Sequence, residues 1–202
     1  MTSTHLAKNL RRLSHVDLPG GGQITISGNH AFIGHMDPPF GTSIVDVSGP
    51  LRPKIVTTLM LENDESHTHK VRVCGDVMIV NVEQYDRHAL RRGEQINQAE
   101  ADLTSKLGRP PTDAELASDL GVSEALIPKV RNFVANGYKD GGFRIYDISD
   151  VARPRELVHK RTFGMGVHRF DADEEFAYIS TEMDGFLGNI LVVYSLADPA
   201  QP

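Results

Sequence analysis

The 202-residue sequence has no tryptophan, a single cysteine (Cys74) and no long apolar run. One cysteine excludes an internal disulfide and a cysteine-based zinc cluster, as is usual in a reducing compartment. No stretch approaches the roughly 18 apolar residues of a membrane span, and the first residues lack the apolar core of a signal peptide. We therefore expect a cytoplasmic protein without a membrane partner.

Positive charge is also scarce, because 21 Lys and Arg residues stand against 27 Asp and Glu residues, which gives a net charge of −6. The chain as a whole repels a polyanion, so any nucleic-acid partner would have to bind a locally basic segment. Hydrophobic residues make up 40% of the sequence, which excludes the disordered and collagen-like classes and allows a substantial core.

The sequence contains an internal repeat. Three segments superpose without gaps: GTSIVDVSGPLRP at 41–53, GFRIYDISDVARP at 142–154 and ILVVYSLADPAQP at 190–202. Further short apolar runs precede each segment and follow the first two, so a unit holds about four strands, the pattern of a β-propeller blade. Asp46 and Asp147 align, and Ser195 takes their place in the third unit, which predicts a structural turn or a hydrogen bond between blades rather than acid or base chemistry.

Between residues 86 and 137 the strand pattern gives way to helical spacing. We predict one helix over 88–107, ended by Gly108, and a second from Thr112, where Thr112 and Glu115 form a capping box. A third helix follows Ser123. The predicted fold is mainly β, an incomplete β-propeller of about three four-stranded blades with an α-helical insert.

The expected organisation has three parts. Residues 16–85 form the first blade and the start of the second, 86–137 form a helix-turn-helix-like insert, and 138–202 complete the second blade and add a third without its last strand. Closed propellers have at least about four blades. We therefore expect either a fragment of a longer propeller or a chain that completes its ring by self-association.

Histidines supply the candidate chemistry. His67 and His69 are spaced i, i+2, so in a strand they share one face. His69 and His168 open equivalent innermost strands, and Glu83 and Glu182 also occupy matching positions. Innermost strands of a propeller line its channel, and imidazole with carboxylate suits a divalent transition metal. These five residues are the predicted metal ligands; alternatively, a strand-opening histidine simply bonds a neighbouring loop.

The insert holds seven Lys or Arg residues and eight Asp or Glu residues, a net of −1, whereas a DNA-binding module should be locally basic. Its candidate DNA-binding residues are Lys129 and Arg131. Pro128 falls about five residues into the expected third helix, where it would remove a backbone hydrogen bond. The alternative is a solvent-exposed helical insertion in a loop between two strands. We expect no nucleic-acid partner.

Two families are similar to parts of this chain. HTHKVRV at 67–73, GGFRIYDISDVARP at 141–154 and the SIVDVS and RIYDIS motifs resemble LVIVD-repeat β-propeller proteins on both sides of the insert. The resemblance implies a propeller fold. A more distant similarity to selenium-binding, methanethiol-oxidase-type propellers implies histidines near the channel that hold a metal. LGRPPTDAELASDLGVS at 107–123 resembles region 3 of primary bacterial sigma factors.

These observations give three functional hypotheses. The first is a binding or scaffold module with an unknown ligand at the channel mouth and no enzymatic activity. The second is a metal-dependent enzyme that uses the histidine and glutamate residues at the channel mouth. The third is a sigma-factor-like role in DNA binding or transcription initiation through the helical insert.

Overall fold

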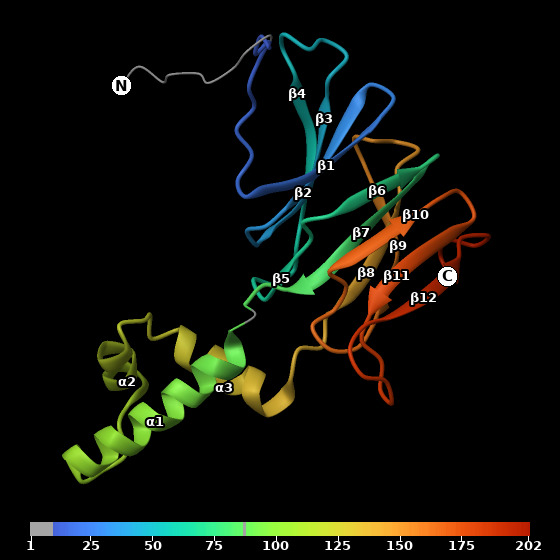
Figure 1. Ribbon diagram of the computed structural model, residues 1–202. Helices are drawn as coiled ribbons and strands as arrows, with labels where there is room; N and C mark the ends of the chain where they lie inside the picture. Colours follow the sequence, from blue (N-terminus) through green and yellow to red (C-terminus); the bar gives the residue numbers. More distant parts are fainter. Residues whose placement is uncertain (1–9, 87) are drawn as a thin grey trace.

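The structure, a computed structural model, describes residues 10–86 and 88–202. These residues form three antiparallel sheets and three helices (Figure 1). The sheets follow one another face to face, and the helices project from them as a separate arm at the lower left of the view. The prediction of a mainly β protein is confirmed, while the described residues do not themselves close into a barrel or propeller.

Each sheet is built from strands that are consecutive in the chain. The first sheet has the order β1 (Gly21–Ser27), β2 (His30–His35), β3 (Phe40–Asp46) and β4 (Lys54–Met60). The second contains β5 (Ser66–His67), β6 (Val71–Cys74), β7 (Val77–Gln84), β8 (Gly142–Asp147) and β9 (Arg155–Arg161), and both β5 and β6 pair with β7. The third has the order β10 (Arg169–Ala172), β11 (Phe176–Thr181) and β12 (Ile190–Ser195).

The internal repeat of the sequence is also a repeat of local structure. After the third strand of each unit, a side-chain oxygen accepts a hydrogen bond from the backbone N–H two residues later. The three bonds are Ser48 to Asp46 (2.8 Å), Ser149 to Asp147 (3.0 Å) and Ala197 to Ser195 (3.3 Å). Short polar side chains stabilise turns in this way. The predicted structural role of Asp46 and Asp147 is confirmed, and Ser195 fills the same role.

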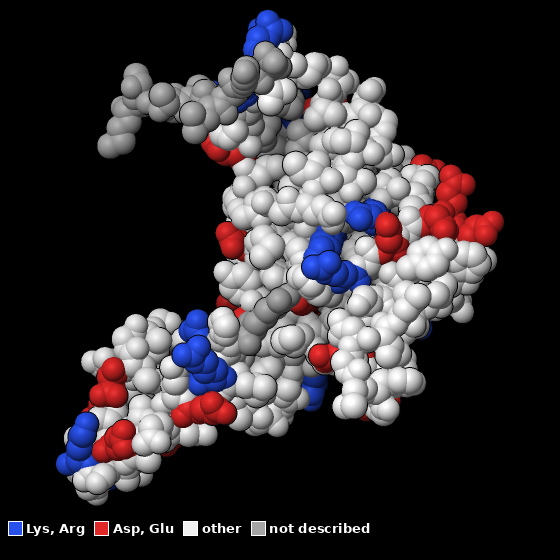
Figure 2. All heavy atoms as spheres, in the orientation of Figure 1, with Lys and Arg blue, Asp and Glu red and all other residues white. Residues whose placement is uncertain are grey.

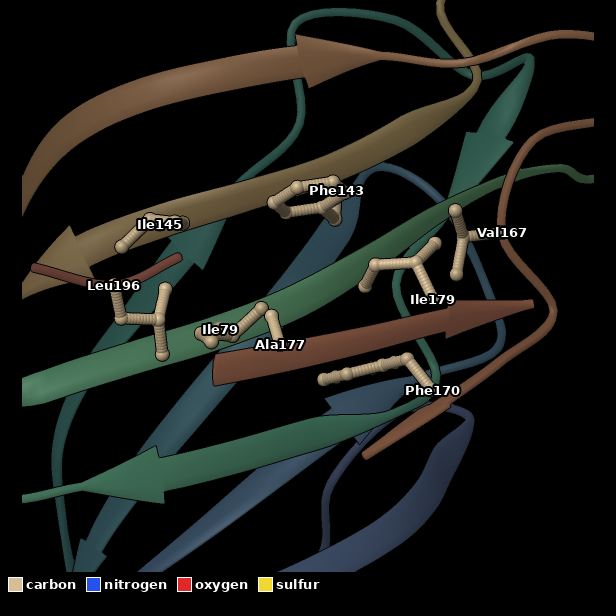
Figure 3. Close-up of a cluster of buried hydrophobic side chains, with 8 residues drawn as sticks. All are labelled: Ile79, Phe143, Ile145, Val167, Phe170, Ala177, Ile179 and Leu196. Carbon is tan, nitrogen blue, oxygen red and sulfur yellow. The ribbon is translucent and has the colours of Figure 1, made fainter. Parts of the chain in front are cut away.

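Neighbouring sheets pack through continuous apolar layers. Between the first and second sheets lie Phe32, Ile44, Val71, Met78, Val80, Tyr146 and Ile148. Between the second and third lie Ile79, Phe143, Ile145, Val167, Phe170, Ala177, Ile179 and Leu196 (Figure 3). Alternate side chains of a strand point to opposite faces, so the second sheet is apolar on both. Each fully buried large side chain contributes about 1.5–3 kcal/mol to the free energy of unfolding.

The helices are α1 (Ala89–Leu107), α2 (Asp113–Leu120) and α3 (Leu126–Asn136). They enclose their own small core of Ile96, Ala99, Leu116, Ala117, Ile127 and Val130. The predicted capping box between Thr112 and Glu115 is present, and Gly108 and Gly121 end α1 and α2 with left-handed φ angles of 68° and 66°. None of the described helices is both long and apolar enough to cross a membrane.

Pro128 corrects one expectation. Because α3 begins at Leu126, Pro128 lies in its first turn rather than five residues into the helix. Backbone N–H groups of a first turn have no partner within the helix, so proline removes no hydrogen bond there.

The layer between the second and third sheets should dominate stability. Phe143 is fully buried and its ring lies 5.1 Å from that of Tyr194. We expect Phe143→Ala to lower the free energy of unfolding by about 3–5 kcal/mol, because it leaves a cavity between two sheets. Urea titration followed by circular dichroism measures this change. Phe186→Ala, at a side chain 58% exposed, is the control and should change stability little; equal effects would contradict the packing described.

Candidate metal centre

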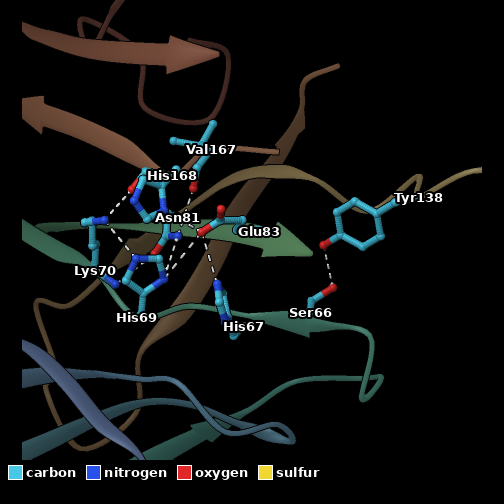
Figure 4. A network of polar contacts seen from close by, with 9 residues as sticks. All are labelled: Ser66, His67, His69, Lys70, Asn81, Glu83, Tyr138, Val167 and His168. Atoms are coloured by element: carbon cyan, nitrogen blue, oxygen red, sulfur yellow. Dashed lines mark hydrogen bonds and ion pairs between the residues drawn. The ribbon is translucent and has the colours of Figure 1, made fainter. Parts of the chain in front are cut away.

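Three histidines converge on one buried carboxylate, that of Glu83 (Figure 4). Its Oε2 atom lies 3.1 Å from Nε2 of His67, 2.8 Å from Nδ1 of His168 and 3.8 Å from Nδ1 of His69. The Glu83 side chain is only 2% exposed. A carboxylate removed from water in this way needs donors to offset its desolvation, and the first two histidines lie within hydrogen-bond distance.

Strand pairing explains how two of these histidines reach Glu83. His67 in β5 is the direct cross-strand partner of Glu83 in β7, and cross-strand partners project from the same face. His69 lies two residues further on, and its ring centroid is 4.6 Å from that of His67. The shared face that the i, i+2 spacing predicts therefore exists.

His168 arrives from the connection between β9 and β10. Gly166 forms a bridge with Glu83, and the N–H of Val167 donates to the carbonyl of Val82 at 3.1 Å. Gly166 has φ near 90°, and a Cβ atom there would lie 2.3 Å from the Val82 carbonyl oxygen. Only glycine allows this approach, which holds His168 over the carboxylate.

Two further polar residues complete the network, Lys70 and Asn81. The Lys70 ammonium lies 2.8 Å from Nε2 of His69 and donates to the carbonyl of His168. The Asn81 amide accepts from the backbone N–H of Lys70 at 2.8 Å and donates to the carbonyl of Val167 at 2.8 Å. Neither residue stands out in the sequence, apart from the adjacency of Lys70 to His69.

Burial sets the protonation state of His69. Desolvation, followed by the nearby charge of Lys70, lowers the pKa of His69 from 6.5 to about 3. Desolvation disfavours the imidazolium form, and a neighbouring cation disfavours it further. His69 is therefore neutral near pH 7, which is the form of imidazole that binds a metal ion.

Three of the five predicted ligands can share an ion. Ligand atoms of His67, His69 and Glu83 all lie within 4.8 Å of one another, and all three residues are buried. His168 bonds Glu83 but falls outside this group. Glu182, the counterpart of Glu83 in the repeat, lies immediately after β11 instead. It pairs with Phe163 and borders a separate hollow of about 290 Å³.

An open hollow of about 370 Å³ adjoins the histidines. It is lined by Met36, His67, Tyr85, Asp86, His88 and His168. His88 had no evident partner in the sequence; it lies here because it precedes α1, shortly after the end of β7. A small molecule in this hollow would contact both His67 and His168.

Lys129 and Arg131, the candidate DNA-binding residues, are both engaged in ion pairs. Lys129 pairs with Asp64, and Arg131 pairs with Glu100 at 3.0 Å and Asp113 at 2.9 Å. On the face shown in Figure 2, basic and acidic side chains are interspersed over the helical arm. The structure therefore places both residues among carboxylates rather than in a basic patch.

Comparison with known families assigns two segments of the chain. Residues 21–60, which span the first sheet, match the LVIVD repeat. Residues 91–136, which span the three helices, match sigma-70 region 3. No curated protein matches the chain. The chain thus combines one segment similar to the LVIVD repeat with a helical segment similar to sigma-70 region 3. Both predicted resemblances find a match, the LVIVD match lying on the N-terminal side of the helices.

The depressed pKa of His69 predicts how stability depends on pH. The unfolded chain binds a proton at His69 below about pH 6.5, whereas the folded chain does so only near pH 3. The contribution of neutral His69 is therefore complete above pH 6.5 and is lost as the pH falls toward 3, by at most about 1.4 kcal/mol per pH unit. We expect His69→Gln to reduce the loss of stability between pH 6.5 and 4.5.

Urea unfolding at several pH values in the presence of a chelator measures this slope. His15→Gln is the matched control, because the His15 side chain is 63% exposed and should leave the slope unchanged. An unaltered slope in His69→Gln would contradict the assignment of His69 as a buried neutral group.

Proposed function

We propose that this protein is a propeller-type binding module that holds a divalent transition-metal ion between His67, His69 and Glu83. The LVIVD repeat and the succession of three antiparallel sheets support the propeller-type architecture. The single observation that carries the metal proposal is the convergence of three buried ligand groups within 4.8 Å. The lone Cys74 supports a cytoplasmic location.

The spacing of the donor atoms suits a metal ion. Bonds of about 2.0–2.2 Å in a tetrahedral site place neighbouring donors roughly 3.3–3.6 Å apart. The observed separations from Oε2 of Glu83 are 3.1 Å to His67 and 3.8 Å to His69. Small side-chain adjustments would therefore suffice. Two imidazoles and one carboxylate favour zinc, copper or nickel over magnesium or calcium.

The positive charge of Lys70 lies close to the proposed ion site and should weaken metal binding, which makes the proposal testable. Its ammonium lies 2.8 Å from Nε2 of His69, the nitrogen that does not face Glu83. A bound dication would be repelled by this charge and would favour movement or deprotonation of Lys70. In the proposal, the negative charge of Glu83 is therefore balanced either by the Lys70 ammonium or by the bound ion.

We expect untagged protein to bind one Zn²⁺ or Co²⁺ per chain. Metal analysis and calorimetry measure stoichiometry and affinity, and Co²⁺ absorbance reports nitrogen ligation. His67→Gln, His69→Gln and Glu83→Gln should each weaken binding by at least roughly tenfold, because each removes a ligand. Lys70→Met should strengthen it roughly tenfold, because it removes a like charge.

Glu182→Gln is the matched control, since Glu182 is the counterpart of Glu83 in the repeat, follows β11 and lies outside the ligand group. It should bind the ion as the unaltered protein does. Circular dichroism of every variant separates ligand loss from unfolding. Absence of stoichiometric metal, or equal affinities in Glu83→Gln and Glu182→Gln, would refute the proposed site.

The match of residues 91–136 to sigma-70 region 3 favours a second candidate function, contact with duplex DNA through the helices. For this role we expect the full chain to bind a labelled duplex at low salt, with affinity that falls steeply as salt rises. Arg131→Gln should weaken binding several-fold and lower the salt dependence. Fluorescence anisotropy measures both, and absence of binding at low salt would eliminate this candidate.

A further inference from the structure

The helical arm leaves the second sheet next to β5 (Figure 1), and a cleft lies at this junction. Its volume is about 510 Å³, which is within the range of small-molecule sites. One wall comes from the segments that flank β5 and β7, and the other comes from α1, α3 and the chain that follows α3. None of the described residues that line it belongs to the proposed ligand group His67, His69 and Glu83.

Three aromatic side chains line the cleft. Tyr85 follows β7, Phe133 lies in α3 and Tyr138 follows that helix. Two of them are held by neighbours. The ring centroid of Tyr85 lies 6.0 Å from that of His67, and the Tyr138 hydroxyl lies 2.7 Å from that of Ser66 (Figure 4). Aromatic rings held in this way offer a ligand both apolar surface and an electron-rich face.

The charges around the cleft favour a cation. Lys129, one of the two basic side chains in the described lining, pairs with Asp64. Arg92, the other, pairs with Asp86 at 3.1 Å. The third carboxylate of the lining belongs to Glu65, which has no ion pair with any described residue. Three carboxylates and two cations therefore give the described lining a net charge of −1.

The pKa of Tyr138 reflects the same negative potential. Burial raises this pKa above its usual value, and the negative charges of Asp140 and Glu65 raise it further, against the opposing effect of the hydrogen bond with Ser66. The hydroxyl therefore stays protonated at neutral pH and adds no charge to the cleft. Negative charges that disfavour a phenolate at this place favour a cation there.

We propose that this cleft binds a small organic ammonium ion, with its charged end beside Glu65 and its apolar part against Tyr85 and Phe133. The carboxylate attracts the positive charge, and so do the electron-rich faces of the aromatic rings. Leu126 and Val130 also line the cleft and suit a ligand with a hydrocarbon chain or ring. This inference goes beyond the proposed metal site and does not depend on it.

Three probes of similar shape test the proposal, namely 2-phenylethylammonium, 2-phenylethanol and 3-phenylpropionate. Ligand-observed NMR and calorimetry on the full chain, with a chelator present, measure their affinities. We expect one ammonium ion to bind per chain. The alcohol should bind at least roughly fivefold more weakly and the anion at least roughly tenfold, because only the cation is attracted by the carboxylate and the rings. No ammonium binding, equal affinities, or a preference for the anion would overturn the proposal.

Two substitutions separate the carboxylate from the aromatic surface. Glu65→Gln should weaken ammonium binding roughly three- to fivefold, because it removes a partly solvated opposite charge. Tyr85→Leu should weaken it roughly threefold, because it removes an aromatic face. The matched controls are Glu62→Gln and Phe186→Leu, at exposed side chains outside the described lining, and neither should change the affinity. Circular dichroism establishes that each variant is folded.

His69→Gln distinguishes this cleft from the proposed metal centre. His69 is not among the described residues that line the cleft, so the variant should bind the ammonium ion as the unaltered chain does while it loses metal affinity. Ammonium binding by a chain that holds no stoichiometric metal would support the cleft and refute the metal site. Unchanged ammonium affinity in both Glu65→Gln and Tyr85→Leu would overturn the cleft proposal, whatever the metal analysis gives.

Discussion

Each sheet of this protein is apolar on both faces, and this constraint organises the whole β part of the molecule. A sheet with one apolar face needs one neighbour, but a sheet such as the second needs two. Its alternate side chains, Ile79 on one face and Met78 and Val80 on the other, enter two separate apolar layers. The sheets therefore pack one after another, face to face. The apolar residues on the outermost faces also require burial.

The histidine cluster lies where the second sheet meets the chain that leads into the third sheet. Glu83 belongs to the second sheet, and His168 belongs to the chain that leads into the third. A carboxylate buried at such a junction stabilises the structure only when donors reach it. The same donors that satisfy the carboxylate are ligands for a metal ion, so the structural network and the proposed site share their atoms.

Much of the local structure follows from short-range sequence signals. The turns at Asp46, Asp147 and Ser195 repeat because a short polar side chain bonds the backbone two residues later. Likewise, the helices follow from apolar spacing, from the capping box at Thr112 and from Gly108. Pro128 was misplaced, because residues after Ser123 form a turn and α3 begins only at Leu126.

The sequence by itself determined the repeat, the helical segment and the pairing of His67 with His69 on one face, since each depends on residues close together in the chain. Only the tertiary structure decided which of two equivalent glutamates receives the histidines. Glu83, in β7, meets His67 from the paired strand β5 and His168 from the chain that leads into the third sheet, whereas Glu182 follows β11 and forms a bridge with Phe163. The two equivalent glutamates have different surroundings because contacts between sheets depend on which neighbouring sheet is present.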